Sequence, residues 1–214
     1  MKPPSAFGLP YDAWRPGQTL AIRTGQSAKT PHVVIQAPTG SGKTAIAVAL
    51  SQGDNRRAAI LTATNHLSDQ YLRTAPVLHG IRGMGNYVCL AAPAEHRKYF
   101  PLRDIERSPV TCDDGMCRSD IDCTLKPDGC TYFDDVRQAF VSTAVQTNYK
   151  YWLSMRRYAN GLGPFSLVIC DEAHALPEEL MDACTVSFTA GQLRDCPPLN
   201  AKRGKWQGGL VANC

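Results

Sequence analysis

The sequence contains no apolar run long enough to span a bilayer, which takes about 20 residues. Its N-terminus, Met1 to Ser5, also lacks the apolar core of a secretory signal peptide. Both absences argue against a membrane or secreted class, and we expect a cytoplasmic protein with no membrane partner. A strong excess of one sign of charge is also absent. The formal net charge of +4 permits a nucleic-acid partner without requiring one.

A tight Cys-x-x-Cys pair is also absent among the nine cysteines, which argues against a zinc ribbon or zinc finger. Five of the nine nevertheless fall in one segment, namely Cys89, Cys112, Cys117, Cys123 and Cys130. Because disulfides are rare in a reducing compartment, this clustering indicates a metal site. The wide, uneven spacing favours an iron–sulfur cluster, whose larger core accepts scattered thiolates, with Zn²⁺ as the alternative.

The bulk composition is that of a soluble globular protein, since 43% of the 214 residues are hydrophobic and 20% are charged. A chain of this length can bury a sizeable core as one large domain, or as one domain with an insert. Between residues 80 and 130 the alternation of strand-like and helix-like patterns stops. Few large apolar residues separate the cysteines there, so the segment is predicted to be an insert stabilised by metal.

The strongest local pattern is a glycine-rich loop at residues 37–44, Ala-Pro-Thr-Gly-Ser-Gly-Lys-Thr. The apolar run Val33–Ile35 before it predicts a buried strand, and Ala45–Leu50 after it predicts a helix. A strand, a glycine turn and a helix N-terminus are the context that a phosphate-binding loop requires. The sequence therefore predicts that the chain binds ATP.

The positions in this loop have individual chemical reasons. Gly40 and Gly42 can adopt positive φ, so that successive N–H groups point at an anion. The helix N-terminus adds partial positive charge, Lys43 can reach the β- and γ-phosphates, and the Thr44 hydroxyl suits Mg²⁺. The residues expected to bind the nucleotide are Thr39, Gly40, Ser41, Gly42, Lys43 and Thr44.

Arg15 and Gln18 lie upstream of the loop and are further candidate nucleotide ligands. A glutamine side chain offers a donor and an acceptor together, so the pair could read an adenine edge. The alternative is a surface turn that caps the short helix expected at Thr19–Ile22. Local sequence favours neither interpretation.

Ala58–Thr64 predicts a second core strand, and Asn65 is expected to cap a helix that runs to about Arg73. Alternating strands and helices imply a parallel sheet with right-handed crossovers. Ligands of such sheets gather at the carboxyl ends of the strands. Thr62, Thr64 and Asn65 would lie there, where they either contact a nucleic-acid strand or only begin the turn.

After the cysteines, residues 132–140 predict an amphipathic helix, residues 144–148 a strand, and residues 149–160 a helix rich in aromatic and basic side chains. Aromatic rings beside arginine can stack on nucleic-acid bases. At helical spacing, however, such rings more often belong to the core, and the core interpretation is favoured.

The second decisive pattern is an apolar strand at residues 165–170 that ends in Asp171-Glu172-Ala173-His174. Acidic groups at the carboxyl end of a strand face the same crevice as a phosphate loop. Asp171 can hold Mg²⁺, together with Thr44, while Glu172 polarises the attacking water. Lys43, Asp171 and Glu172 are therefore the predicted catalytic residues of ATP hydrolysis.

The order of these patterns resembles the first motor domain of superfamily-2 DNA helicases, and more closely their iron–sulfur branch, the XPD/DinG helicases. The resemblance covers residues 11–185 and includes Arg15–Gln18, Ala37–Thr44, Thr62–Asn65, Thr147–Tyr149 and Asp171–His174. It implies a RecA-like α/β fold, in which a parallel sheet with helices on both faces is interrupted by a cysteine-rich metal-binding insert.

The resemblance also implies cofactors and partners. ATP and Mg²⁺ would serve a motor that moves on single-stranded DNA, and a 4Fe-4S cluster would lie beside the DNA path. Asn86–Cys89 resembles the segment of the first cluster ligand, and Gly129–Tyr132 resembles that of the last. The implied ligands are Cys89, Cys117, Cys123 and Cys130, with Cys112 competing for a middle place.

These boundaries predict an ATP-binding domain from residues 1–80 and 133–190, an insert at residues 81–132, and an irregular tail at residues 191–214. Members of the family add a second motor domain that supplies arginines to the ATP site, and nothing after His174 resembles it. We therefore expect a motor domain that is incomplete without a second motor domain or partner chain. The alternative is an ATP-switched DNA-binding module or accessory protein without helicase activity.

Overall fold

The computed structural model describes residues 1–53, 56–91, 110–115, 123–126, 128–158 and 161–185. The chain divides into two units, residues 1–183 and 184–214, and the fold below is that of the first. None of the described helices is both long and apolar enough to cross a membrane. The predicted tail at residues 191–214 lies outside the described residues.

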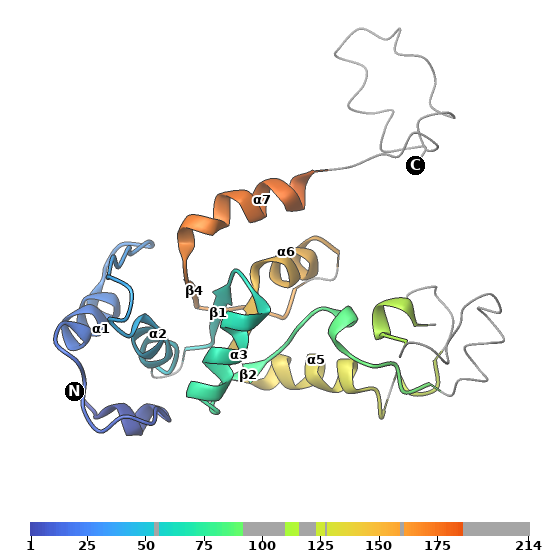
Figure 1. Ribbon diagram of the computed structural model, residues 1–214, viewed down its shortest axis with the longest axis horizontal. Helices are drawn as coiled ribbons and strands as arrows, with labels where there is room; N and C mark the ends of the chain where they lie inside the picture. The colour runs from blue at the N-terminus through green and yellow to red at the C-terminus, as the bar shows by residue number, and fades with distance from the viewer. Residues whose placement is uncertain (54–55, 92–109, 116–122, 127, 159–160, 186–214) are drawn as a thin grey trace, which may run out of the picture. The chain divides into compact units, whose positions relative to one another are not determined.

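A sheet of four parallel strands organises the first unit (Figure 1). The strands are β1 (Ala58–Thr62), β2 (His79–Gly80), β3 (Ala144–Asn148) and β4 (Leu167–Cys170), in the order β2-β3-β1-β4. Every residue of β1 is buried, and this strand pairs on both sides. In register, Ile60 lies opposite Gln146 of β3 and Ile169 of β4. The prediction of a parallel sheet is confirmed.

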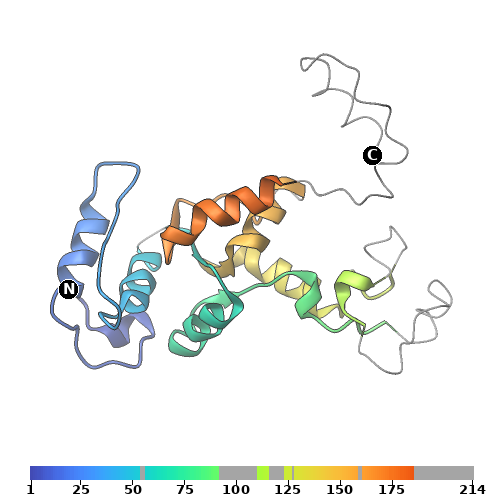
Figure 2. The ribbon, with the colours of Figure 1, turned by 45° about the horizontal axis from the view of Figure 1, so that its top comes forward.

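The described α-helices are α1 (Gln18–Ser27), α2 (Lys43–Ser51), α3 (Asn65–Thr74), α5 (Thr131–Val141), α6 (Tyr149–Tyr158) and α7 (Leu176–Cys184). Short 3-10 turns lie at η1 (Pro4–Phe7), η2 (Met84–Asn86), η3 (Cys112–Asp114) and η5 (Ala173–Ala175). Helices α1 and α2 pack against each other, as Figures 1 and 2 show.

Helices cover both faces of the sheet, and successive residues of a strand, which point to opposite sides, contact different helices. Ile60 packs on one side with Val48 of α2 and Tyr71 of α3. Leu61 packs on the other side with Tyr149 of α6, and α5 meets β3 on that side as well. This layered arrangement is consistent with the RecA-like α/β fold that the resemblance implies.

The strand predicted immediately before the glycine-rich loop is wrong. Residues 32–38 have no regular secondary structure and return as an extended segment from α1 toward α2 (Figure 2). The side chain of Val34 is 93% exposed, whereas Ile35 packs against the core of α2. A run as short as Val33–Ile35 does not distinguish a buried strand from an extended surface segment by its apolar character alone.

The start of α3 also differs from the prediction, which had Asn65 as its cap. Thr64 is the cap, since its hydroxyl oxygen accepts a hydrogen bond from Leu67 N at 3.3 Å. Threonine there satisfies one of the backbone donors that the first helical turn leaves unpaired. The Asn65 amide group bonds to the side chains of Asn86 and Asn148.

Between β2 and α5, where the sequence predicts the insert, the described residues form only short elements. Val88 and Thr111 form an isolated antiparallel bridge, with η2 and η3 beside it. Ile81 and Cys112 are buried in one cluster with residues of α5 and α6. Residues 92–109 and 116–122 lie outside the described residues, and the predicted boundaries at residues 81 and 132 stay a prediction.

Candidate active site

The glycine-rich loop leads directly into α2, whose first residue is Lys43. Gly40 and Gly42 have φ of 79° and 82°, in the left-handed region that favours glycine. A Cβ atom at Gly42 would lie 2.3 Å from Nε2 of Gln18, so a side chain there would be strained and would displace the Gln18 amide. Ser41 Oγ is buried without a hydrogen-bond partner among the described residues. An anion in the loop would supply the partner that buried polar atoms ordinarily have.

Arg15 and Gln18 are bound to this loop. Arg15 Nη1 donates to Gly40 O at 2.7 Å, and Gln18 Nε2 donates to the carbonyl oxygens of Ser41 and Gly42 at 3.0 and 3.2 Å. Gln18 Oε1 accepts from Arg15 N at 2.8 Å, and Gln18 is only 4% exposed. Both amide donors of Gln18 are thus engaged by the loop backbone. Sequence reasoning missed this support because the partners lie far away along the chain.

Asp171 follows β4 at the carboxyl edge of the sheet, where its N–H donates to Leu61 O at 2.9 Å. Its Oδ2 accepts from the Tyr71 hydroxyl at 2.9 Å, and its Oδ1 accepts from Glu172 N at 3.0 Å. The Tyr149 hydroxyl donates to the Asp171 carbonyl oxygen at 2.9 Å. Hydrogen bonds therefore fix both the carboxylate and the main chain of Asp171.

The two tyrosines remain protonated at neutral pH. Burial raises the pKa of Tyr71, and the charge of the Asp171 carboxylate raises it further. Burial likewise raises the pKa of Tyr149, with a smaller contribution from the neighbouring Cys170 thiol. Because a protonated hydroxyl is the donor in both contacts to Asp171, these hydrogen bonds persist through the physiological pH range.

Lys43 and Glu172 lie far apart in the sequence but meet at this edge of the sheet. Lys43 Nζ lies 3.0 Å from Oε1 of Glu172, and the two side chains are 33% and 34% exposed. His174 Nδ1 lies 3.3 Å from Oε2 of the same carboxylate. Among the described residues, Glu172 is the one non-glycine residue with a positive φ, of 50°. The glycine-rich loop and the acidic strand end therefore share one crevice.

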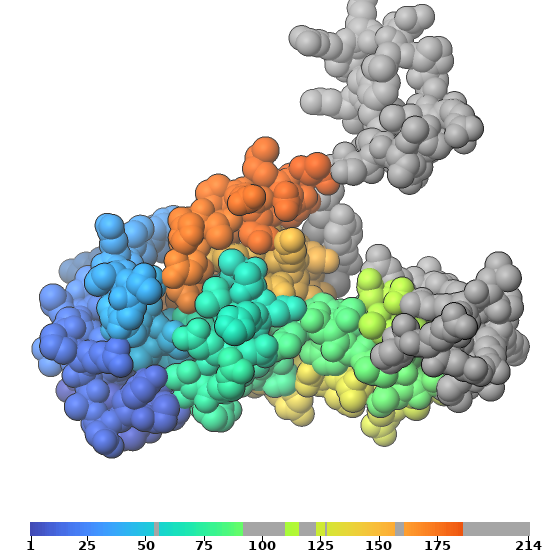
Figure 3. All heavy atoms as spheres, viewed as in Figure 1, coloured from blue at the N-terminus to red at the C-terminus, as the bar shows by residue number. Residues whose placement is uncertain are grey.

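This crevice is a cavity of about 390 Å³, within the usual range for small-molecule sites. In Figure 3 the N-terminal segment, α3 and the segment after β4 adjoin one another. Of the predicted residues, those that line the cavity are Arg15, Gln18, Thr39, Gly40, Gly42, Lys43, Thr44, Asp171 and Glu172. Further lining residues that sequence reasoning missed are Tyr11, Ala13, Ala45, Leu67, Gln70 and Thr74. The last three recur at helical spacing on α3, which is the signal that could have found them.

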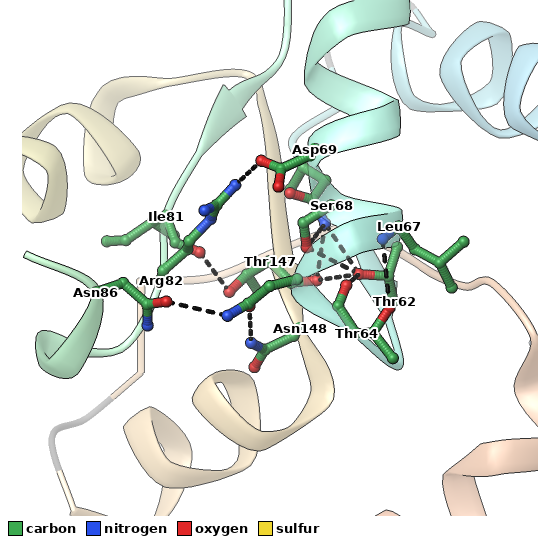
Figure 4. A network of polar contacts seen from close by, with 12 residues as sticks. Thr62, Thr64, Leu67, Ser68, Asp69, Ile81, Arg82, Asn86, Thr147 and Asn148 are labelled. Carbon is green, nitrogen blue, oxygen red and sulfur yellow. Dashed lines mark hydrogen bonds and ion pairs between the residues drawn. The ribbon is translucent and has the colours of Figure 1, made fainter.

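A buried polar network lies at the carboxyl ends of β1 and β3 (Figure 4). Gln146 Nε2 donates to Ser68 Oγ at 2.7 Å and to Thr62 Oγ1 at 3.2 Å. Thr147 Oγ1 donates to Ile81 O at 2.7 Å. Thr62 is 0% exposed, so the hypothesis that it contacts a nucleic-acid strand is wrong. Its hydroxyl serves the network inside the sheet.

Next to this network, three asparagines connect separate parts of the chain (Figure 4). Asn148 Nδ2 donates to Asn65 Oδ1 at 2.7 Å, and Asn65 Nδ2 donates to Asn86 Oδ1 at 3.0 Å. Arg82 also forms an ion pair with Asp69 of α3. The segment that leads from β2 to Cys89 is therefore tied to the same edge of the sheet as the cavity.

The described aromatic rings of α6 belong mainly to the core. Tyr149 is 0% exposed and Tyr151 is 7% exposed. The ring of Trp152 packs against Phe165, with centroids 5.2 Å apart. These positions favour the core interpretation of the aromatic pattern over base stacking.

The described cysteines of the insert are Cys89, Cys112, Cys123 and Cys130. Burial raises the pKa of the Cys89 thiol, a hydrogen bond with the Ala91 main chain lowers it, and Cys123 and Cys130 raise it to a smaller extent. Cys112, Cys89 and Cys130 pack in the same apolar cluster. No group of three or more potential ligands placed to hold a metal ion occurs within the described part of the chain. Cys117 lies outside it, so the predicted ligand set stays a prediction.

Residues 15–96 match the DEAD/DEAH box helicase family. A comparison with curated proteins found no match for the chain. Together with the parallel sheet, the family match supports a superfamily-2 helicase motor domain that binds ATP and uses Mg²⁺.

Proposed function

We propose that this chain is the ATP-hydrolysing motor domain of an iron–sulfur DNA helicase that acts on single-stranded DNA. The observation that carries the proposal is the 3.0 Å contact between Lys43 and Glu172, which joins a phosphate-binding loop to an acidic strand end in one cavity. The DEAD/DEAH box match over residues 15–96 supports the motor assignment. The DNA substrate and the iron–sulfur cluster are the parts of the proposal that go beyond that match.

The residues of the cavity have complementary roles in this proposal. The N–H groups around Gly40 and Gly42 bind the phosphates, and Lys43 leaves Glu172 to reach the β- and γ-phosphates. Glu172, once released, accepts a hydrogen bond from the attacking water and polarises it. Thr44 and Asp171 would hold Mg²⁺, which neutralises charge on the phosphates when it is bound.

We infer that a second motor domain or partner chain completes this site. Among the described residues, the cations that line the cavity are Arg15 and Lys43. Arg15 donates to Gly40 O, and Lys43 is assigned to the β- and γ-phosphates. A further arginine would therefore have to stabilise the charge that develops during phosphoryl transfer, and its absence slows such reactions by ~10³-fold or more.

Single-stranded DNA is proposed to cross the carboxyl ends of β1 and β3. Thr64 is exposed there, and Asn65 and Asn148 are partly exposed. Amide and hydroxyl groups suit contacts to a sugar–phosphate backbone. The hydrogen bond from Asn65 to Asn86 would place the segment that leads to Cys89 beside this path.

The iron–sulfur assignment rests on the cysteines that follow Asn86. The proposed ligands are Cys89, Cys117, Cys123 and Cys130, with Cys112 as the competitor, and the packing of Cys89, Cys112 and Cys130 in one cluster supports a shared site. Thiolate is the ligand that both a 4Fe-4S cluster and Zn²⁺ accept, so the metal must be identified chemically. A cluster there would join segments of the insert that are far apart in the chain.

The proposal is tested on one anaerobically purified preparation of the full chain. We expect about four iron and about four acid-labile sulfide per chain, and slow ATP hydrolysis that single-stranded DNA stimulates little in the chain alone. Adding a second motor domain should raise hydrolysis and make single-stranded DNA a stronger stimulant than duplex DNA or RNA. Stoichiometric zinc without sulfide would replace the cluster with a zinc site. Stimulation by RNA alone would overturn the DNA assignment.

Two variants separate binding from hydrolysis in the same assay. Lys43→Ala should abolish ATP binding, because the phosphates lose their principal cation. Glu172→Gln should retain binding and lower hydrolysis by a factor on the order of 10² or more, because the amide cannot polarise water. Equal ATP affinity of wild type and Lys43→Ala would show that the site is wrongly assigned. ATP binding without hydrolysis by the wild type, alone or with a second motor domain, would favour the DNA-binding module.

A further inference from the structure

We propose that Tyr71 is a positioning residue for the metal-binding carboxylate of Asp171. The inference rests on the proposed function, in which Asp171 and Thr44 hold Mg²⁺, and adds a residue that the nucleotide-binding motifs do not contain. Tyr71 belongs to α3, on a different element from either proposed metal ligand.

The first observation is the location of the Tyr71 ring. It belongs to the apolar cluster of α2 and β1 that includes Val48 and Ile60, and the residue is 1% exposed. A ring packed in this way has little rotational freedom, because protein interiors are as dense as organic crystals. Its hydroxyl group consequently has a fixed position next to Asp171, which lines the cavity.

The second observation is what that hydroxyl contacts. It donates to Oδ2 of Asp171 at 2.9 Å, and the Thr44 side chain approaches the same hydroxyl. Oδ1 of Asp171 is held separately by Glu172 N at 3.0 Å. With one donor on each oxygen, the plane of the carboxylate is set, and each oxygen keeps a lone pair for a metal ion or its water.

A hydrogen bond of this kind acts on the metal through its ligand. Groups that hydrogen-bond to a metal-ligating side chain fix its orientation, and their loss typically lowers metal affinity by 10- to 100-fold. Phenylalanine would satisfy the apolar cluster equally well, so packing alone does not require the Tyr71 hydroxyl. Contact with a charged carboxylate gives that hydroxyl a strong, charge-assisted bond.

The test compares Tyr71→Phe with Tyr149→Phe in the full chain. Each variant removes one buried hydroxyl that bonds Asp171, but the Tyr149 hydroxyl reaches the main-chain carbonyl rather than the carboxylate. ADP binding is measured by calorimetry, first in excess EDTA and then across a Mg²⁺ titration. The readout is the Mg²⁺ concentration that gives half of the metal-dependent gain in ADP affinity, and thermal unfolding confirms that each variant folds.

We expect Tyr71→Phe to raise this Mg²⁺ concentration on the order of tenfold while ADP affinity in EDTA is unchanged. Tyr149→Phe should leave the Mg²⁺ dependence close to that of the wild type. An equal shift in both variants, or no shift in Tyr71→Phe, overturns the inference. A loss of ADP affinity in EDTA also overturns it, because the hydroxyl would then shape the nucleotide site itself. Failure of the wild type to bind ADP would instead refute the proposed function.

Discussion

At the scale of single residues, Gln18 illustrates how a partner far along the chain defines a role. A glutamine near a phosphate loop could serve the base or the protein, and the local sequence is the same in both cases. The structure engages both donors of its amide with the carbonyl oxygens of Ser41 and Gly42. Adenine recognition would require this amide to leave the loop, so support of the loop is the better-founded role.

Gln18→Ala should therefore weaken ATP and GTP binding alike, each by about tenfold, the loss expected for about 1.4 kcal/mol of hydrogen bonding. The reason is that the loop loses its support whichever base is attached to the phosphates. Titration of both nucleotides, with the exposed Gln26→Ala of α1 as a neutral control, measures the effect. A loss confined to ATP would restore the adenine interpretation.

Residue roles were predictable from sequence where the chemistry is local. The left-handed glycines of the loop and the adjacent pair Asp171 and Glu172 are visible as short motifs. Tyr71 was not predictable in this sense, because a tyrosine on an amphipathic helix has the appearance of a core residue, and its ring is one. Only the meeting of α3 with the end of β4 reveals what its hydroxyl does.

At the scale of secondary structure, the sequence predicted most elements that have a clear period. The strand predicted at residues 144–148 has the bounds of β3, and the helix predicted at residues 132–140 is α5 with one more residue at each end. The short strand β2 escaped prediction, because two residues carry no periodicity. The wrong strand at Val33–Ile35 has a related cause, since so short a run does not reveal whether it is paired.

Arg57 holds three of these elements together at the edge of the sheet opposite the cavity. Its guanidinium donates to the carbonyl oxygens of Ala139, Ser142 and Pro164, and it packs over the ring of Phe165 at 4.0 Å. Burial lowers the pKa of Arg57, but arginine stays charged at neutral pH. The start of β1, the end of α5 and the approach to β4 are thus fixed by one side chain.

Arg57→Met should lower the free energy of unfolding by about 2–3 kcal/mol, because three carbonyl groups lose a charged donor. Arg56→Met, at the exposed neighbouring position, serves as the matched control and should change it by less than about 0.5 kcal/mol. Urea unfolding of both variants gives the comparison. Indistinguishable midpoints would show that Arg57 does not join these elements.

At the scale of the whole molecule, the meeting of Lys43 with Glu172 follows from topology more than from any local pattern. Asp171 and Glu172 follow β4 at the carboxyl edge of the parallel sheet, and α2, which contacts β1 and β4, brings Lys43 into the same crevice. The sequence contained that prediction once the alternation of strands and helices was recognised. The packing of the cysteine segment against α5 and α6 was not predictable, because irregular segments carry no periodic signal.

The positive φ of Glu172 has a consequence for the stability of the whole protein. The left-handed conformation costs most residues about 1–2 kcal/mol, and asparagine tolerates it better than glutamate. Glu172 therefore supplies a proposed catalytic carboxylate, but the native state is less stable than it would be with a residue that tolerates this conformation. This is a trade-off between stability and activity, of the kind that functional sites commonly impose.

Glu172→Asn should accordingly abolish hydrolysis yet raise the melting temperature by about 2–4 °C, the shift that corresponds to about 1 kcal/mol in a chain of this size. The gain should be clearest at high salt, where the half-exposed pair with Lys43 is screened and contributes little to the wild type. Glu178→Asn, in the first turn of α7, introduces the same residue at a helical position and should give no such gain. A fall in the melting temperature of Glu172→Asn would mean that the contacts of the Glu172 carboxylate stabilise the native state by more than its backbone strain destabilises it. The catalytic carboxylate would then carry no net cost in stability.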